Sequence, residues 1–278
     1  MISWTSSGLV RTPNTVQIRC NSEMPKELKA GAPSPNRSLS NQELAENLQY
    51  FRFALDTPRT IPCSSLTLSG LNGDDSGRFE TIKQFPFDYI TLHVSSDSIN
   101  WMELAHYQQG YQRISIPLNA KTAALQIPSW AISKTTLVIS LEEGLEAWLP
   151  SAIERANQEN WNPFVFLYPF PLNRQSSPLS PQKAIELLEQ LTKNCKKNPI
   201  IKGLPYCLAK TKYTLFAKTT NRWYVDAAHQ KEKALLFFPD VSCYYKDDQC
   251  RFCRHNEECD GFFLEYLKIH NLHLRVIE

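Results

Sequence analysis

The sequence predicts an α/β fold, because strand-like and helix-like runs alternate over the first two thirds of the chain and a cysteine-rich segment follows. Runs rich in Val, Ile, Thr and Phe recur, and several precede stretches with apolar residues at helical spacing. This alternation is typical of parallel βαβ units with helices outside a sheet or barrel. About six units can be counted, fewer than the eight of a closed TIM barrel. We therefore expect a partial (β/α)6 TIM-like barrel over residues 1–198 and a small cysteine-rich extension over residues 199–278.

The elements of the first part follow one another with clear signals. "TVQIRC", "SSLTLSG" and "DYITLHV" predict the first three strands. Between the first two, "SLSNQELAENLQYFRFAL" predicts a helix, because Ser40 can cap it, Glu43 completes a capping box, and Leu44 and Leu48 lie on one face.

Further strands are expected at "RISIPL", "AALQIP", "TLVISL" and "FVFLYPF". "EEGLEAWLPSAIERANQ" has helical spacing, although Pro150 disturbs its first turns. Ser180 and Pro181 mark the start of a helix over "SPQKAIELLEQLTKN". No convincing helix is predicted between Ser95 and Lys134.

The pattern changes near Pro199. "LPYCLAKTKYTLFAKTTNRWYVDAA" and "ALLFFPD" predict antiparallel strands, and a last helix follows the cysteines.

Composition places the chain among ordinary globular proteins. Of its 278 residues, 42% are hydrophobic and 21% charged, and the net charge is +2. The near balance of charge gives no indication of a nucleic-acid partner. No apolar run is long enough to span a membrane, and the first residues lack the pattern of a secretory signal. We therefore expect a cytoplasmic protein whose thiols are reduced.

Four of the eight cysteines lie between Cys243 and Leu267. Cys250 and Cys253 form a C-x2-C pair, Cys259 follows, and Cys207 in "GLPYCLA" is a distant fourth candidate. Buried thiols and disulfides are the alternatives. Charged neighbours disfavour a continuous core, and a reducing compartment disfavours disulfides. A metal site is the preferred interpretation, because two thiolates in a tight turn can converge on one ion or cluster. The chemistry leaves zinc and an iron–sulfur cluster open.

The segments "GLPYCLA" and "CRFCRHNEECDGFFLEYLKIHNLHLRVIE" resemble the C-terminal segment of some radical S-adenosylmethionine (SAM) enzymes. Those enzymes carry Gly-x-Pro-x-Cys, then C-x2-C-x5-C-x-G and a short helix with a Tyr, which Gly261 and Tyr266 match here. The resemblance implies that the four candidate cysteines hold an auxiliary four-iron (4Fe-4S) cluster. Cys243 would be an extra thiol, and its exchange for one of the four is the open point of this assignment.

The motif that defines radical SAM enzymes is missing. They need C-x3-C-x2-C after the first strand, but here Cys20 is followed by no cysteine until Cys63. One thiolate cannot hold a cluster with an open iron for SAM. We therefore expect a degenerate relative that keeps the auxiliary cluster and does not cleave SAM.

Small-molecule binding is expected, if anywhere, at the barrel mouth. Gly70 ends the second strand and His93 the third, and ligands usually bind at the carboxyl ends of barrel strands. A hydrogen-bonded structural role is the alternative for His93. Glu142 and Glu143 follow another strand, where paired carboxylates could bind a metal or shuttle protons. Acids that stabilise the N-terminus of a helix are the more common explanation.

The leading functional hypothesis is a radical-SAM-like pseudoenzyme that carries the auxiliary cluster. It would act as a partner or substrate-presenting subunit, bound to a protein or peptide, in the maturation of a ribosomally made peptide. One alternative is an active enzyme, SAM-independent or relaying electrons through the cluster, with its site at the barrel mouth. The other is a zinc-stabilised protein-binding module.

Overall fold

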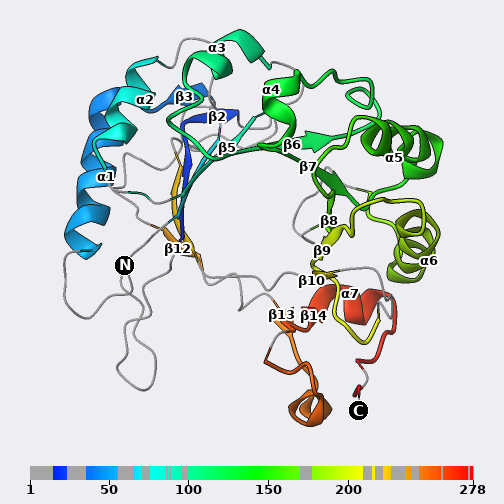
Figure 1. Cartoon of the computed structure of the whole chain (residues 1–278). Coiled ribbons are helices and arrows are strands. Elements are labelled where there is room, and N and C mark those ends of the chain that lie inside the picture. The colour runs from blue at the N-terminus through cyan, green and yellow to red at the C-terminus, as the bar shows by residue number, and fades with distance from the viewer. Residues whose placement is uncertain are drawn as a thin grey trace. The chain divides into compact units, whose positions relative to one another are not determined.

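Two compact units make up the structure, a computed structural model. It describes residues 15–23, 36–55, 65–69, 76–85, 87, 89–94, 99–169, 177–208, 215–216, 222–226, 236–238, 244–257, 259–274 and 276–277. Unit 1 comprises Met1–Ile114 and Thr220–Pro239, and unit 2 comprises Ser115–Thr219 and Asp240–Glu278. Each unit combines β-strands with flanking helices, which confirms the α/β class (Figure 1).

Unit 1 is built on a mostly parallel sheet. Its strands lie in the order β12-β11-β1-β4-β5, and they are β1 (Thr15–Arg19), β4 (Ser65–Ser69), β5 (Tyr89–His93), β11 (Arg222–Asp226) and β12 (Leu236–Phe238). β11, β1, β4 and β5 pair in parallel, and only β12 runs antiparallel to its neighbour. A hairpin of β2 (Asn21–Glu23) and β3 (Asn36–Ser38) follows β1.

The described part of unit 1 contains the helices α1 (Asn41–Leu55), α2 (Ser76–Lys83) and α3 (Trp101–His106). The predicted capping box of α1 is confirmed, since the Glu43 N–H donates to Ser40 Oγ at 3.1 Å and the Ser40 N–H donates to Glu43 Oε2 at 2.9 Å.

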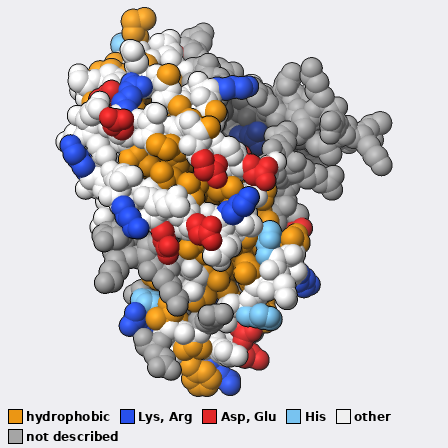
Figure 2. Space-filling model, turned by 90° about the vertical axis from the view of Figure 1, so that its right-hand side faces the viewer, with side chains coloured by type: hydrophobic (Ala, Val, Ile, Leu, Met, Phe, Trp, Pro, Cys, Tyr) orange, Lys and Arg blue, Asp and Glu red, His pale blue; other side chains and the backbone are white. Residues whose placement is uncertain are grey.

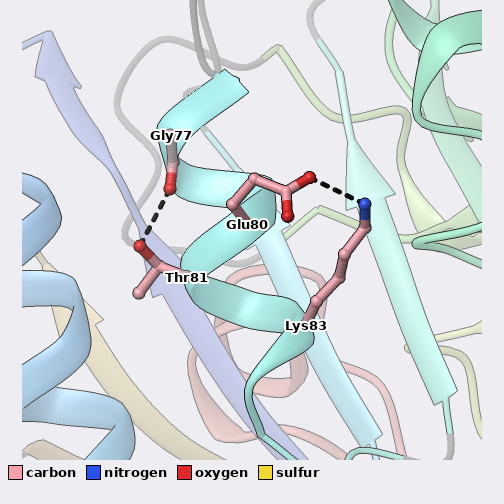
Figure 3. A network of polar contacts seen from close by, with 4 residues as sticks. All are labelled: Gly77, Glu80, Thr81 and Lys83. Carbon is pink, nitrogen blue, oxygen red and sulfur yellow. Dashed lines mark hydrogen bonds and ion pairs between the residues drawn. The ribbon is translucent and has the colours of Figure 1, made fainter.

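Two side-chain contacts lie within α2, one a hydrogen bond to the backbone and the other an ion pair. Thr81 Oγ1 donates to the Gly77 carbonyl at 2.8 Å, and Lys83 Nζ lies 2.8 Å from Glu80 Oε1 (Figure 3). The ion pair lies on an exposed face, so it contributes little to stability.

The two faces of the unit 1 sheet differ in chemistry. The apolar side chains of β1, β4 and β5 alternate with polar ones and are buried; they are Val16, Ile18, Leu66, Leu68, Ile90 and Leu92. Leu44 and Leu48 of α1 and Phe79 and Ile82 of α2 are also buried, and the helices lie along one face of the sheet (Figure 1). The other face therefore carries the polar residues.

Unit 2 contains the second run of strands. They are β6 (Arg113–Leu118), within which the chain passes between units, β7 (Thr135–Ser140), β8 (Val165–Leu167), β9 (Ile200–Lys202) and β10 (Leu215–Phe216). β7, β8, β9 and β10 pair in parallel. Its helices include α4 (Ser129–Ile132), the 3-10 turn η2 (Leu145–Ala147), α5 (Leu149–Gln158) and α6 (Pro181–Thr192).

The helix-start signals of unit 2 are confirmed. Ser180 Oγ accepts from the Lys183 N–H at 3.3 Å, and Pro181 opens α6. Pro150 lies in the first turn of α5, where a missing N–H does no harm, so the helix begins at Leu149 after a break.

The C-terminal part of unit 2 is short and turn-rich. β13 (Tyr244–Tyr245) pairs antiparallel with β14 (Phe262–Phe263), the 3-10 helix η5 (Asp248–Phe252) lies between them, and α7 (Leu264–Ile269) follows. The last helix was predicted, and this part of the expectation is confirmed.

Three local predictions are wrong. "AALQIP" forms turns rather than a strand. The stretch from Ser95 to Lys134 contains α3 and α4, and α3 begins after Asn100, whose Oδ1 accepts from the Glu103 N–H at 3.2 Å.

The third correction concerns the strands after Pro199. β9 pairs in parallel with β8 and β10, and β11 pairs in parallel with β1. Among the described residues after Pro199, only the β11–β12 and β13–β14 pairs are antiparallel. β11 lies beside β1, so the compact units follow strand pairing rather than the expected division at residue 198. Strand pairing between distant segments leaves no local signal in sequence.

No closed barrel is found among the described strands, so the TIM-like barrel remains a prediction. Among the described residues, no helix has the length and apolar character needed to cross a membrane. The face drawn in Figure 2 carries described acidic and basic side chains interspersed, in keeping with the net charge of +2.

Candidate functional site

Four predicted cysteines of unit 2 line one hollow. Cys207 comes from the turn after β9, Cys250 and Cys253 from η5 and its end, and Cys259 from the approach to β14. The hollow has a volume of about 290 Å³, counting the part open to solvent. Its lining is completed by Pro205, Tyr206, Lys246, Asn256, Gly261 and Leu274. The four thiols therefore line the same hollow, and their role as metal ligands stays a prediction.

A glycine permits the turn that carries Cys207. Gly203 has φ of +83°, and a Cβ there would lie 2.9 Å from the Tyr168 carbonyl oxygen. The turn closes where the Leu208 N–H donates to the Pro205 carbonyl at 3.1 Å. Gly203 and Pro205 thus set the backbone that presents Cys207.

Successive turns present the other three thiols. Asp247 caps η5 by accepting from the Gln249 N–H at 3.1 Å. The Cys253 N–H donates to the Cys250 carbonyl at 3.0 Å, and the Cys259 N–H donates to the His255 carbonyl at 2.9 Å. A metal-binding loop needs this kind of tightly turned backbone, because thiolates a few residues apart must face one point.

Gly261 allows the chain beside the hollow to pass close to the backbone of β13. Its N–H donates to Cys259 Sγ at 3.3 Å, and its φ is +89°. A Cβ at this position would lie only 2.1 Å from the Tyr245 carbonyl oxygen, so no other residue fits beside β13.

One contact joins the two segments that supply the cysteines, and another closes the loop of 244–257 on itself. The rings of Tyr206 and His255 stack with centroids 4.5 Å apart and an angle of 3° between planes. Lys246 Nζ donates to Asn256 Oδ1 at 3.1 Å and also to the Asn256 carbonyl. His255 is therefore placed as a stacking residue. Sequence reasoning missed Lys246 and Asn256 as lining residues, because neither belongs to a motif.

The electrostatics of the hollow disfavour neighbouring thiolates. Burial raises the pKa of the Cys250 thiol, and the thiols of Cys259 and Cys253 raise it further, while a backbone hydrogen bond at Asp247 opposes this. A bound cation would remove the repulsion, because coordination to a metal deprotonates thiols.

Zinc and an iron–sulfur cluster require different spacings of the four thiols. Within the described residues, no three His, Cys, Asp or Glu side chains are grouped so as to hold one metal ion. Four thiolates on one zinc would lie about 3.8 Å apart, from Zn–S bonds of about 2.3 Å in a tetrahedron. An iron–sulfur cluster instead spreads its thiolates, one on each iron. The donor set, four thiols around one hollow, is of a kind that either centre uses.

The remaining cysteines lie elsewhere or outside the described residues. Cys20 is fully buried after β1, and Cys195 donates its thiol to the Leu191 carbonyl at 3.6 Å. Cys63 and Cys243 fall outside the described residues, so whether Cys243 replaces a ligand stays open. None of the six described cysteines forms a disulfide.

The second candidate site belongs to unit 1. His93 ends β5 as predicted and is half-buried, and burial lowers its pKa. In register beside it on β4 is Ser69, whose following residue, Gly70, lies outside the described residues. In unit 2, Glu142 accepts from Ser140 Oγ at 2.8 Å and forms an isolated bridge with Pro178, which is a structural role.

Comparisons with known proteins add no family. A scan against protein-family models matches none, and a search of curated proteins finds no match.

Proposed function

We propose that Cys207, Cys250, Cys253 and Cys259 hold one four-iron cluster, and that the protein uses it as a radical-SAM-like subunit without SAM-cleaving chemistry. The observation that carries this proposal is the shared hollow, to which two segments separated by more than 40 residues contribute four thiols. The resemblance of both segments to those of enzymes with auxiliary clusters supports the same assignment.

The residues around the thiols have roles that follow from their contacts. The Gly261 N–H donates to the Cys259 sulfur, and hydrogen bonds to ligand sulfurs raise a cluster's reduction potential. Lys246, held by Asn256, brings a positive charge to the wall of the hollow. Tyr206 and His255 hold the two ligand-bearing segments together. When bound, such a cluster supplies one-electron transfer.

The segment after β1 lacks the three thiolates that SAM cleavage needs. The only cysteine that follows β1 closely is Cys20, which is fully buried. A single buried thiol offers no place for a cluster with an open iron. We therefore infer a partner or substrate-presenting role, in which a peptide or protein binds while a complete enzyme performs the chemistry. Maturation of a ribosomally made peptide is the suggested context, by analogy with enzymes that carry auxiliary clusters.

Anaerobic purification with iron, sulfide and zinc quantification tests the cluster. We expect a brown protein with about four irons and four sulfides, as a cluster of this type requires. The variants Cys250→Ala and Cys253→Ala should each lose the visible absorption. Cys195→Ala is the matched control, because Cys195 is a half-buried cysteine of the same unit outside the hollow. A colourless protein with one zinc would overturn the cluster assignment and support the zinc-stabilised module.

Single substitutions decide the fourth ligand. We expect Cys207→Ser to lose iron and Cys243→Ser to retain it. The reverse result would transfer the fourth position to Cys243 while leaving a cluster in place.

The partner role needs its own experiment. The iron-loaded protein should release no SAM cleavage product under a strong reductant, and it should co-purify with a relative that carries C-x3-C-x2-C. Reductive SAM cleavage by the protein alone would overturn the subunit role without affecting the cluster.

A further inference from the structure

Lys246 brings a positive charge into the wall of the cysteine hollow. The other lining residues, apart from the four thiols, are apolar, aromatic, amide or glycine residues. Among the described residues that line the hollow, Lys246 is therefore the charged one besides the thiols. It follows β13 directly in the chain. The balance of charge inside the hollow depends on where its ammonium is held.

The stem of Lys246 crosses Gly261 on its way along the hollow. A Cβ at Gly261 would lie 2.9 Å from Lys246 Cγ, so the lysine stem packs against the glycine backbone. The same glycine donates its N–H to Cys259 Sγ at 3.3 Å. The lysine stem therefore lies beside the peptide that contacts one of the candidate ligands.

The ammonium of Lys246 is anchored in the loop between Cys253 and Cys259. Its Nζ donates to Asn256 Oδ1 at 3.1 Å and also to the Asn256 carbonyl. Asn256 donates its own N–H to the Cys253 carbonyl at 2.9 Å. Lys246 is an exposed residue, but these two contacts with one partner restrict its head group. The charge is thus fixed within the segment that supplies three of the four thiols.

A metal centre with four thiolates needs such a charge. Four thiolates bring more negative charge than one Zn²⁺ neutralises, and a four-iron cluster with four thiolates is likewise an anion. Asp247 and Asp248 add negative charge near Cys250, although neither lines the hollow. A cation in the wall stabilises a negative centre, and it stabilises the centre more after an electron has been added.

We propose that Lys246 offsets the negative charge of the metal–thiolate centre, which strengthens metal binding and, in a cluster, raises the reduction potential. Lys246 acts through its charge and not as a ligand, because an ammonium has no lone pair for a metal. Asn256 is a positioning residue, since it holds the ammonium at the wall. This inference rests on the proposed metal role of the four thiols and applies to either metal.

Zinc titration of the metal-free full chain, in competition with a chromogenic chelator, tests the charge. Lys246→Met removes the ammonium and keeps an unbranched stem over Gly261, whereas Lys246→Arg keeps the charge. We expect Lys246→Met to weaken zinc binding about tenfold, at the lower end of what residues around a metal centre contribute. Lys246→Arg should retain most of the affinity. Lys268→Met is the matched control, because Lys268 is an exposed lysine of α7 that does not line the hollow.

Two further readouts separate charge from a purely structural contact. The loss of zinc affinity in Lys246→Met should shrink at high salt, because ions screen an exposed charge. In the iron-loaded protein, the reduction potential of Lys246→Met should lie below that of the wild type and of Lys268→Met, and Lys246→Arg should restore it. Thermal unfolding of each variant shows that any loss of binding is not a loss of folding.

The outcomes distinguish this proposal from the cluster assignment. Lys246→Met that matches Lys268→Met in zinc affinity and potential would overturn the role of Lys246, as would Lys246→Arg that is as impaired as Lys246→Met. A chain that takes up no cluster but shows the expected differences with zinc would overturn the cluster and support the role of Lys246. A chain that binds neither metal would overturn both.

Discussion

Gly261 lines the cysteine hollow and has a backbone conformation that favours glycine. Replacing it should lower the free energy of unfolding for two reasons that can be separated. Gly261→Ala places a side chain at φ +89° and drives its Cβ into the Tyr245 carbonyl. Gly144 offers the control, because it has φ +86° and a Cβ added there would meet no described atom within 4 Å. We expect Gly144→Ala to lower the free energy of unfolding by about 1 kcal/mol and Gly261→Ala to lower it by a further ~1–3 kcal/mol through overpacking.

Chemical denaturation of both glycine variants measures this difference. Iron content of Gly261→Ala should fall as well, because the same residue holds the Cys259 sulfur. Equal destabilisation by the two substitutions would show that β13 moves aside without penalty.

His93 predicts a pH dependence of stability. Burial lowers its pKa in the folded protein from 6.5, so below that value the unfolded chain binds more protons than the folded chain. The stability that His93 contributes is present above about pH 6.5 and is lost as the pH falls through the folded-state pKa. Between pH 7 and 5, the melting temperature of the wild type should therefore fall more steeply than that of His93→Gln. Parallel slopes would contradict a buried, neutral imidazole.

At the scale of elements, α7 is attached to unit 2 by aromatic side chains. Tyr266 is buried, and its ring lies 5.1 Å from that of Tyr168 and 5.8 Å from that of Phe262. Tyr168 is itself fixed, because its hydroxyl donates to the Leu179 carbonyl at 2.7 Å. These contacts give Tyr266, which sequence resemblance singled out, a packing role.

Truncation of Tyr266 should release the helix. We expect Tyr266→Ala to cost about 3–5 kcal/mol of unfolding free energy, as for other buried aromatic residues, and Tyr266→Phe to cost far less because the ring contacts remain. Urea denaturation measures both. A large loss for Tyr266→Phe would mean that its hydroxyl, rather than its ring, is the important group.

Helix caps were predictable from sequence, because they depend on residues a few positions apart. Ser40 with Glu43, and Ser180 with Pro181, are local signals and were confirmed. Asn100 with Glu103 is an equally local signal that marks α3, yet that helix was missed because it is only six residues long. The parallel partners of β11 could not be predicted, since pairing with β1 joins residues about 200 positions apart.

At the scale of the whole molecule, the two candidate sites differ in the same way: one depends on local sequence signals and the other on the pairing of distant strands. The cysteine hollow could be predicted because closely spaced thiols and one motif-bearing turn identify its members without a structure. The second candidate site, at the carboxyl ends of β4 and β5, could be predicted only in part. His93 and the end of β4 were expected at the mouth, but Arg19 joins them through the register of β1 with β4. Lys246 reaches the hollow through its contact with Asn256, which no motif reports.

The division into two units predicts that iron removal acts locally. A ligand at 100 times its dissociation constant stabilises the state that binds it by about 2.7 kcal/mol. If the cluster is present, its removal by chelation should therefore speed amide exchange about 100-fold in peptides from 244–257 and 259–274, where the cysteine-bearing turns have few strand hydrogen bonds. Peptides from β1, β4 and β5 belong to unit 1 and serve as the internal control. Exchange that rises equally in both sets would mean that the metal supports the whole fold. Exchange unchanged in 244–274 would mean that the turns hold the thiols together without it.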